Sequence, residues 1–387
     1  MKSKRILTVL GQIDDDYIAE AIADNKKSIG IPWLKWGSVA AGFILILTIG
    51  IFLATGRQGP DRLPLLTIDE FQTGGMGYEG YFAHNIDELV NNNPWSSDST
   101  IKSLPVYKNS LFQYTKEGIV TDPNIAEMKQ ILIDTAESLG MNTKNLSINE
   151  KYDENGLYDN LIESIYLEDE NYKVNVNTWM RVNVDLKKSN VLPEGYSLSR
   201  YASYDELYKT AEYILKEYAD FIHMENACID ISLGDYDVDG NRRWNVSFYE
   251  GFGNMTERIT NYNFRGVDFY SDDEGNVHAS FGNTDLSDII GDYPIIRSEE
   301  ALDLLCKGKY VTSVPEEFPG RDSVKKVELI YLSSTRNEIF MPYYKFYVEG
   351  DFTNRNRENL GLTSFDVYYV PAVEEAYIKN MPQWDGH

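Results

Sequence analysis

The sequence predicts an α+β protein: one N-terminal transmembrane helix, then repeated modules that each combine a helix with an antiparallel meander of strands. Three observations predict this class. An uncharged apolar run near the N-terminus is long enough to span a bilayer. After residue 122, a helical pattern followed by short alternating strands occurs three times. The chain of 387 residues also contains 28 Tyr, a residue that suits the half-buried surface of a sheet.

The apolar run extends from Gly37 to Thr55 without a charged residue. As a helix it would rise about 28 Å, which matches a hydrocarbon core of about 30 Å. Basic residues precede the run at Lys26, Lys27 and Lys35. By the positive-inside rule, the sequence predicts a cytoplasmic tail over residues 1–35, a transmembrane helix over 36–56 and an extracellular C-terminal region, so we expect a single-pass protein of the cell membrane.

A cleaved signal peptide is the alternative interpretation of this run. Ala54 and Gly56 are small enough to flank a processing site. The charged leader before the run is long for a signal peptide, and this favours the anchor.

The cytoplasmic tail contains one short helical pattern. Asp14, Asp15 and Asp16 suit the start of a helix, and the lysines before the anchor suit its end. Its apolar face consists of Ile13, Tyr17, Ala21 and Ile22. We expect this face either to dock a cytoplasmic partner or to lie on the bilayer, because so short a helix is marginal alone.

Charge is distributed unevenly along the chain. The first 56 residues are nearly neutral, so almost all of the net charge of −25 lies beyond the anchor. This excess of carboxylates excludes nucleic acid as a partner, since phosphate binding requires clustered Lys and Arg. Anionic lipid and anionic wall polymers would be repelled in the same way.

Two cysteines occur, Cys228 and Cys306, and no CxxC pair accompanies them. This spacing argues against a structural zinc site. We expect two buried thiols, with a disulfide as the alternative, because a domain of this size needs no covalent staple.

The region beyond the anchor divides into four parts. For residues 57–121 the sequence predicts a linker and an irregular segment that wraps over the main body. We expect one short strand near residues 65–68 and Trp95 packed on the main body. Three αβ modules follow, over residues 122–200, 201–292 and 293–387.

Each module begins with a helix. The first predicts a helix over 123–139 and strands over 145–152, 161–167 and 173–184. The second predicts a helix over 204–222, with Ser203 and Glu206 as its capping box, and strands over 227–233, 243–249, 266–270 and 277–281. The third predicts a helix over 298–305 and strands over 324–331, 343–349 and 365–370. This repeated arrangement resembles PepSY-like and cystatin-like modules.

Two further resemblances concern the ends of the chain. The stretch LGQIDDDYIAEAIADNKK, followed by WLKWGSVAAG, is similar to the N-termini of clostridial membrane proteins described as anti-sigma factors or sigma-factor regulators. The stretches FMPYYKFYVE and FDVYYVPAVEE resemble the extracytoplasmic domains of membrane-anchored regulators of the cell-wall histidine kinase in low-GC Gram-positive bacteria. The tail lacks the His and Cys residues of the zinc-binding anti-sigma module, because the first histidine is His84 and the first cysteine is Cys228. A sigma factor would therefore dock in another way than on that module.

The sequence DYDVDGN is the sharpest local motif. Asp235, Asp237 and Asp239 alternate and precede a glycine, as in the first half of a calcium loop. Position twelve of such a loop would be Val246 rather than glutamate. The flanking strand patterns favour a hairpin turn, in which Asp and Gly meet the demands of the turn itself. A calcium site and a hairpin turn are the two open interpretations.

No nucleophile motif or zinc-protease motif occurs, and the four histidines are isolated from one another. We therefore expect a non-enzymatic membrane regulator or sensor that uses no cofactor. Its outer region would bind an extracytoplasmic protein, peptide or wall ligand, and its tail would engage a cytoplasmic sigma factor or a membrane histidine kinase. The alternatives are a tethered binding or protease-inhibitory module that does not signal through the tail, and a cell-wall hydrolase that uses two of the many carboxylates.

Overall fold

The computed structural model describes residues 63–68, 79–110, 124–152, 162–187, 191–334, 337–350 and 360–384. The predicted tail and transmembrane helix lie outside the described residues, and so do the predicted docking residues Ile13, Tyr17, Ala21 and Ile22. Within the described ranges, no helix is both long enough and apolar enough to cross a membrane.

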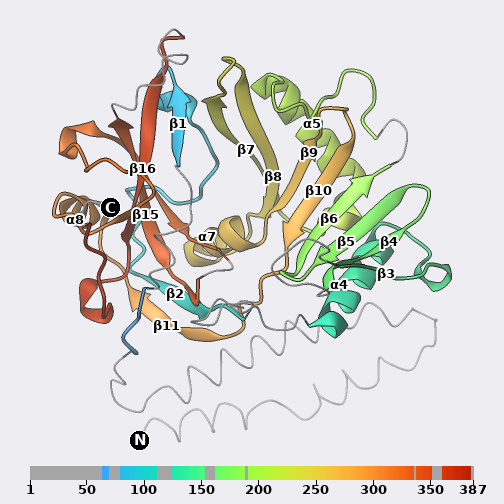
Figure 1. The fold of residues 1–387 in the computed structure, drawn as a ribbon, viewed down its shortest axis with the longest axis horizontal. Helices are drawn as coiled ribbons and strands as arrows, with labels where there is room; N and C mark the ends of the chain where they lie inside the picture. The colour runs from blue at the N-terminus through green and yellow to red at the C-terminus, as the bar shows by residue number, and fades with distance from the viewer. Residues whose placement is uncertain are drawn as a thin grey trace, which may run out of the picture. The chain divides into compact units, whose positions relative to one another are not determined.

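The predicted fold class is wrong. Antiparallel strands dominate the described residues, which hold sixteen strands in three sheets and five α-helices (Figure 1). Strands of residues 122–200 and strands of residues 201–292 join in one eight-stranded sheet, so they are not separate helix-plus-meander units. The joining of two meanders pairs strand edges that would otherwise be exposed.

The eight-stranded sheet has the order β3-β4-β5-β6-β10-β9-β8-β7. Its first half contains β3 to β6, which are Asn149–Tyr152, Ile162–Glu168, Tyr172–Asn177 and Arg181–Leu186. Its second half contains β7 to β10, which are Ala227–Tyr236, Arg242–Glu250, Val267–Ser271 and Val277–Gly282. The halves meet where β6 pairs with β10, with Val182 opposite Phe281. The predicted strand over 173–184 is two strands, since the chain turns at Met180 with a φ of 55°.

One face of this sheet is apolar and carries the larger core. Alternation along the strands brings Val, Ile and Phe side chains to this face, among them Val174, Val182, Phe248 and Phe269. Helices α4 (Ile125–Ser138), α5 (Tyr204–Glu217) and α6 (Ala219–Ile222) pack on it (Figure 1). Their apolar stripes include Met128, Leu132, Leu207 and Ile214, all fully buried.

Helix α5 begins at a complete capping box, which confirms its predicted start. The Ser203 hydroxyl accepts the Glu206 backbone N–H at 3.3 Å, and the Glu206 carboxylate accepts the Ser203 N–H at 2.9 Å. We expect Ser203→Ala to lower the free energy of unfolding by about 1 kcal/mol. Urea denaturation measures this loss. The control Ser287→Ala, at an exposed serine that caps no helix, should stay within about 0.5 kcal/mol of wild type. Equal values for the two variants would contradict the capping role.

The second sheet has the order β1-β16-β15-β13, and β12 also pairs with β16. Strand β1 is Gly80–Ala83, β12 is Val311–Thr312, β13 is Val324–Tyr331, β15 is Pro342–Gly350 and β16 is Thr363–Pro371. Strands β15 and β16 are buried on both faces and are rich in aromatic residues, among them Tyr343, Phe346 and Tyr368. Helix α8 (Ser298–Leu305), predicted with these bounds, packs against β16.

Helix α7 (Met255–Phe264) contacts both β8 of the first sheet and β13 of the second. Its buried residues Ile259 and Phe264 belong to the core of the second sheet. In Figure 1 it lies between the two sheets. The helix thereby forms one wall of the space above β8.

A third, three-stranded sheet has the order β11-β2-β14. Its strands are Ile289–Pro294, Ser103–Lys108 and Ile339–Phe340. Strand β2 therefore lies in the region predicted as an irregular wrap. The predicted packing of Trp95 is confirmed, because its buried ring meets Tyr344 edge-on at a centroid distance of 5.6 Å.

Both cysteines are free thiols. Cys228 is half-buried and Cys306 is exposed. The prediction of two buried thiols is therefore wrong for Cys306, which ends helix α8 on the surface.

Candidate functional site

The second face of the eight-stranded sheet is polar across its width. Directly paired positions from β4 to β7 carry Tyr166, Asn175, Asn183, Ser280, Asp268, Ser247 and Asp230. We call this series the polar row. Its members are half-buried or buried. These polar side chains are shielded from water but lie outside the apolar core. Such side chains are characteristic of a binding surface.

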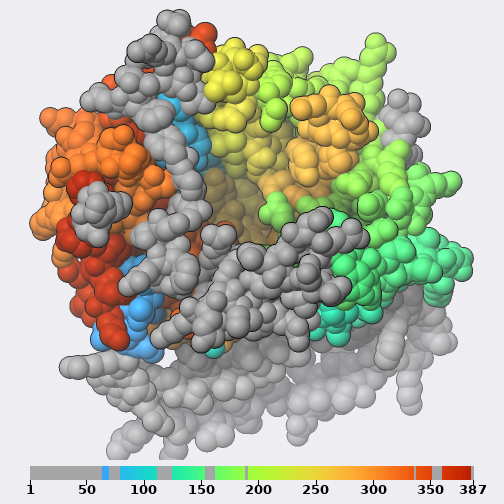
Figure 2. Space-filling view, viewed as in Figure 1, coloured from blue at the N-terminus to red at the C-terminus, as the bar shows by residue number. Residues whose placement is uncertain are grey.

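A cavity of about 580 Å³ opens on the polar row at its β7 end. We call it the sheet cavity. Its floor includes Asp230, Ser247 and Asp268, and Tyr262 and Phe264 of α7 line it as well. In Figure 2 the olive residues of β7 and β8 lie recessed between the orange and red C-terminal residues and the green residues of the sheet. The volume falls within the range of about 300–1,000 Å³ that is typical of small-molecule sites.

Two carboxyl groups dominate the floor of the cavity, that of the buried Asp230 and that of the half-buried Asp268. Burial raises the pKa of Asp230 to about 6; the nearby Glu328 and Asp268 carboxylates add to the rise, and hydrogen bonds from Asn92 and Ser232 oppose it. Burial also raises the pKa of Asp268, against the opposing effects of Arg181 and Asn245. Their strands are separated by β8 alone, so the two backbones lie about 9.6 Å apart.

Aromatic rings line the cavity above these carboxyl groups. Tyr249 of β8 and Tyr262 of α7 meet edge-on at a centroid distance of 5.2 Å. Trp179, from the turn between β5 and β6, and Phe340 of β14 complete the aromatic lining. The cavity thus combines acidic groups, amide and hydroxyl groups and several ring faces.

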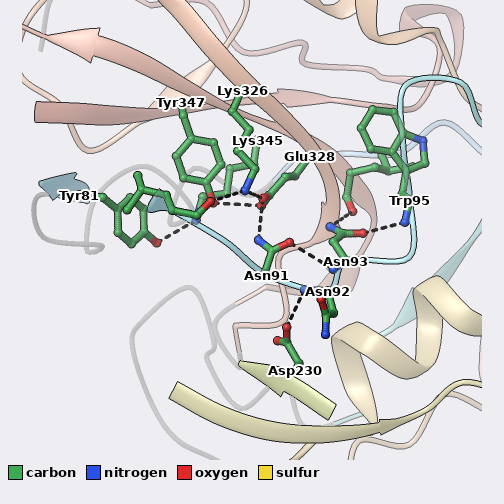
Figure 3. A network of polar contacts seen from close by, with 12 residues as sticks. Tyr81, Asn91, Asn92, Asn93, Trp95, Asp230, Lys326, Glu328, Lys345 and Tyr347 are labelled. Atoms are coloured by element: carbon green, nitrogen blue, oxygen red, sulfur yellow. Dashed lines mark hydrogen bonds and ion pairs between the residues drawn. The ribbon is translucent and has the colours of Figure 1, made fainter. Parts of the chain in front are cut away.

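The segment Asn91–Asn93 joins the two sheets beside the cavity (Figure 3). The Asn91 side chain donates to Glu328 of β13 at 2.6 Å, and the Asn92 backbone N–H donates to Asp230 of β7 at 2.6 Å. The Asn93 side chain donates to the Leu329 carbonyl at 3.1 Å. Three consecutive asparagines therefore connect the second sheet to the floor of the cavity.

Glu328 extends this connection into a buried cluster. Its carboxylate accepts the Tyr347 hydroxyl at 3.0 Å and pairs with Lys326 at 2.7 Å. Lys345, next to Tyr347, donates to Glu79 and to the Tyr81 hydroxyl, each at 2.9 Å (Figure 3). We call Glu79, Tyr81, Lys345, Tyr347 and Tyr369 the Lys345 cluster.

The Lys345 cluster holds its charges in a buried position. Burial alone would lower the pKa of Lys345, but the surrounding tyrosines and Glu79 raise it above its ordinary value. Burial alone would raise the pKa of Glu79, but Lys345 and hydrogen bonds from Lys345, Tyr369 and Tyr81 lower it. Both groups are therefore ionised, and each depends on the other.

The aspartates of the predicted calcium motif lie in the β7–β8 hairpin, Asp235 near the end of β7 and Asp237 and Asp239 in the turn. Asp235 is 2% exposed and pairs with Arg243. Asp237 accepts the backbone N–H groups of Asp239 and Asn241, each at 2.9 Å, and Asp239 is exposed. These carboxylates point to different partners. No group of three or more His, Cys, Asp or Glu side chains suited to a metal ion occurs in the part of the chain that the structure describes.

Sequence reasoning missed Asp230 and Asp268 as site residues. A signal existed, because the strands CIDISL and VDFYS alternate polar and apolar residues and so predict one polar face. What hides this face from water comes from elsewhere in the chain, namely α7 and the segment Asn91–Asn93. That burial cannot be read from a strand.

Comparisons with known proteins give no family. No protein-family model matches the chain, and no curated protein matches it significantly. The chain is similar to the crystal structure of an uncharacterized protein from Eubacterium rectale, at 13% identity and with a TM-score of 0.33. The match covers 74% of this chain and 86% of that chain. So distant a likeness contributes no argument about function.

Proposed function

We propose that this chain is a membrane-anchored sensor whose outer region binds a small polar ligand in the sheet cavity. The cavity supports this proposal by its size, its mixed polar and aromatic lining, and the carboxyl groups of Asp230 and Asp268 on its floor. In this proposal the cytoplasmic tail reports binding to a sigma factor or to a membrane histidine kinase.

One observation carries the proposal: continuous polar contacts lead from the cavity floor to the second sheet. Asp230 is bound by Asn92, and the adjacent Asn91 is bound to Glu328. Tyr347 and Lys345 continue the contacts to Glu79, which directly precedes strand β1. A ligand that moves Asp230 would therefore disturb groups that fix the first strand after the N-terminal region. Such contacts are a candidate route of coupling, which requires a test.

The first described residues of the outer region are also firmly attached. The Leu66 N–H donates to the Tyr377 carbonyl at 2.8 Å, and the Lys379 N–H donates to the Leu66 carbonyl at 2.8 Å. Ile68 exchanges two hydrogen bonds with the Asn380 side chain, at 2.7 and 2.6 Å. The predicted short strand near residues 65–68 is thus a single bridge at Leu66. These bonds fix the described residues nearest to the predicted anchor to residues 377–380, which follow strand β16.

We expect the tail to be required for signalling. In the native host, deletion of the gene should change a defined set of transcripts, and the wild-type chain should restore them. A chain that lacks residues 6–24 should not restore them, although it keeps the lysines that set its orientation in the membrane. Sequencing of total RNA measures the outcome, with protease accessibility as a check on topology.

Two further variants test the coupling. Asn91→Ala should restore the transcripts less well than wild type, because it breaks the contact with Glu328. Asn149→Ala, at an exposed position on the edge strand β3, should restore them fully.

Full restoration by the tail-deleted chain would reject the sensor and favour a tethered binding module.

One observation favours a second candidate, a wall-active glycoside hydrolase. Asp230 and Asp268 lie on the same face of the sheet, separated by one strand, at a backbone spacing of about 9.6 Å. Inverting glycosidases hold their carboxyl groups about 6.5–9.5 Å apart. Release of reducing sugar from purified cell wall, abolished by both Asp230→Asn and Asp268→Asn, would support this candidate. Unchanged wall would reject it.

A further inference from the structure

The charged groups that line the sheet cavity do not balance. They are Arg181, Asp230 and Asp268 among the described residues. Arg181 lies 3.5 Å from Asp268 and donates to Ser280 at 2.8 Å, so its positive charge is paired with the Asp268 carboxylate. Within the described part of the chain, no basic side chain forms an ion pair with Asp230, although Asp230 is only 4% exposed.

A buried carboxylate without a cationic partner costs free energy. Core packing gives no reason to keep it, since isosteric Asn would make the same hydrogen bond with the Asn92 N–H. The missing cation is therefore best explained as part of a ligand. The net charge of −25 agrees with this, because a strongly acidic protein attracts cationic solutes and repels anionic ones.

The walls of the cavity suit a cation as well. Ring faces attract ammonium groups, and Tyr249, Tyr262 and Trp179 all line the same space as the carboxyl groups. The Tyr262 hydroxyl makes no hydrogen bond to any described residue, yet it adjoins both the sheet cavity and a smaller cavity of about 170 Å³ beside Glu328. A ligand that donates hydrogen bonds would find an acceptor in this hydroxyl.

We propose that the ligand of the sheet cavity bears a primary ammonium group, which pairs with Asp230 and packs against Tyr249 and Tyr262. This inference rests on the proposed sensor function and names the class of its ligand. One ammonium group offsets the one carboxylate in excess on the floor. The same group occurs on a lysine side chain and at a peptide N-terminus, and suitable probes separate these two sources.

Four probes test this class on the full chain in lipid nanodiscs. The amide of Nα-acetyl-lysine offers a side-chain ammonium, and alanine amide offers an α-ammonium. The Nε-acetylated form of the first probe is its neutral twin, and chitobiose is a neutral sugar. Fluorine NMR of fluorotryptophan-labelled protein reports binding at Trp179, whose signal is assigned with Trp179→Phe.

We expect saturable shifts of the Trp179 signal with at least one ammonium probe and binding at least about tenfold weaker for the neutral twin. Asp230→Asn should weaken ammonium binding about tenfold or more at pH 7. Tyr262→Phe should weaken it by a smaller factor. The matched control Asp239→Asn makes the same change of charge on the same hairpin, at an exposed position, and should bind like wild type.

Binding of chitobiose or of the neutral twin as tightly as the ammonium probes would overturn the proposal. Affinity that is unaffected by Asp230→Asn would also overturn it, and so would the absence of any shift. These outcomes are separate from the fate of the sensor proposal, which depends on whether the tail-deleted chain restores transcription.

Discussion

Replacement of Lys345 by methionine is expected to lower the free energy of unfolding by about 3–5 kcal/mol. Lys345 is 8% exposed, and its ammonium group donates to Glu79 and Tyr81. Methionine fills a similar volume but leaves the Glu79 carboxylate inside the fold without a cation. The cost is that of an uncompensated buried charge rather than of a missing contact.

Equilibrium urea denaturation of Lys345→Met against wild type measures this loss. Lys325→Met is the matched control, because Lys325 pairs with Glu349 on the surface, where an ion pair contributes about 0–1 kcal/mol. The double variant Glu79→Gln with Lys345→Met should be less destabilised than Lys345→Met alone, since it buries no charge. A Lys345→Met loss as small as that of the control would contradict the role given to the cluster.

The sequence predicted most strands and three of the helices close to their positions. Period-two alternation and capping signals are local, and β13 and helix α8 were predicted with the bounds that the structure has. Helix α7 was missed because it has a polar sequence. Its capping box of Asn254 and Glu257 was the available signal.

The arrangement of the strands in sheets could not be predicted in the same way. Pairing of β6 with β10 joins residues about a hundred positions apart, and pairing of β1 with β16 joins the two ends of the described chain. Helix and strand patterns predict the elements of a module. They do not predict whether the edge strand of its sheet stays unpaired. An unpaired edge strand favours pairing with another strand. Here strands of residues 122–200 pair with strands of residues 201–292, so the two predicted modules share one sheet.

The candidate site was hidden for a related reason. Asp230 and Asp268 are unremarkable in a chain with 61 Asp and Glu residues. Their place on the floor of the sheet cavity makes them distinctive, and it depends on α7 and on Asn92 rather than on their own strands. The acidic motif at Asp235, Asp237 and Asp239 looked sharper in the sequence, but its carboxylates serve the hairpin and Arg243.

The second large effect is expected from Asp230→Asn, which should stabilise the fold at neutral pH. The pKa of Asp230 is raised from 3.8 to about 6 in the folded chain. Below about pH 3 the carboxyl group is largely protonated in both states. As the pH rises from about 3 to 6, the unfolded chain releases this proton first, so the native state binds more protons and loses stability. A rise of about two pKa units corresponds to about 3 kcal/mol.

The variant is free of this loss because Asn stays neutral and can still accept the Asn92 N–H. Its free energy of unfolding should approach that of wild type below about pH 3 and exceed it by up to about 3 kcal/mol at pH 7. Urea denaturation at half-unit steps of pH measures the difference, and carboxyl groups that do not interact with Asp230 cancel because both proteins share them. A difference between Asp230→Asn and wild type that does not change with pH would contradict the prediction. A wild-type chain that keeps Asp230 at such a cost in stability uses the carboxylate for something other than folding, and the sheet cavity is where that use would lie.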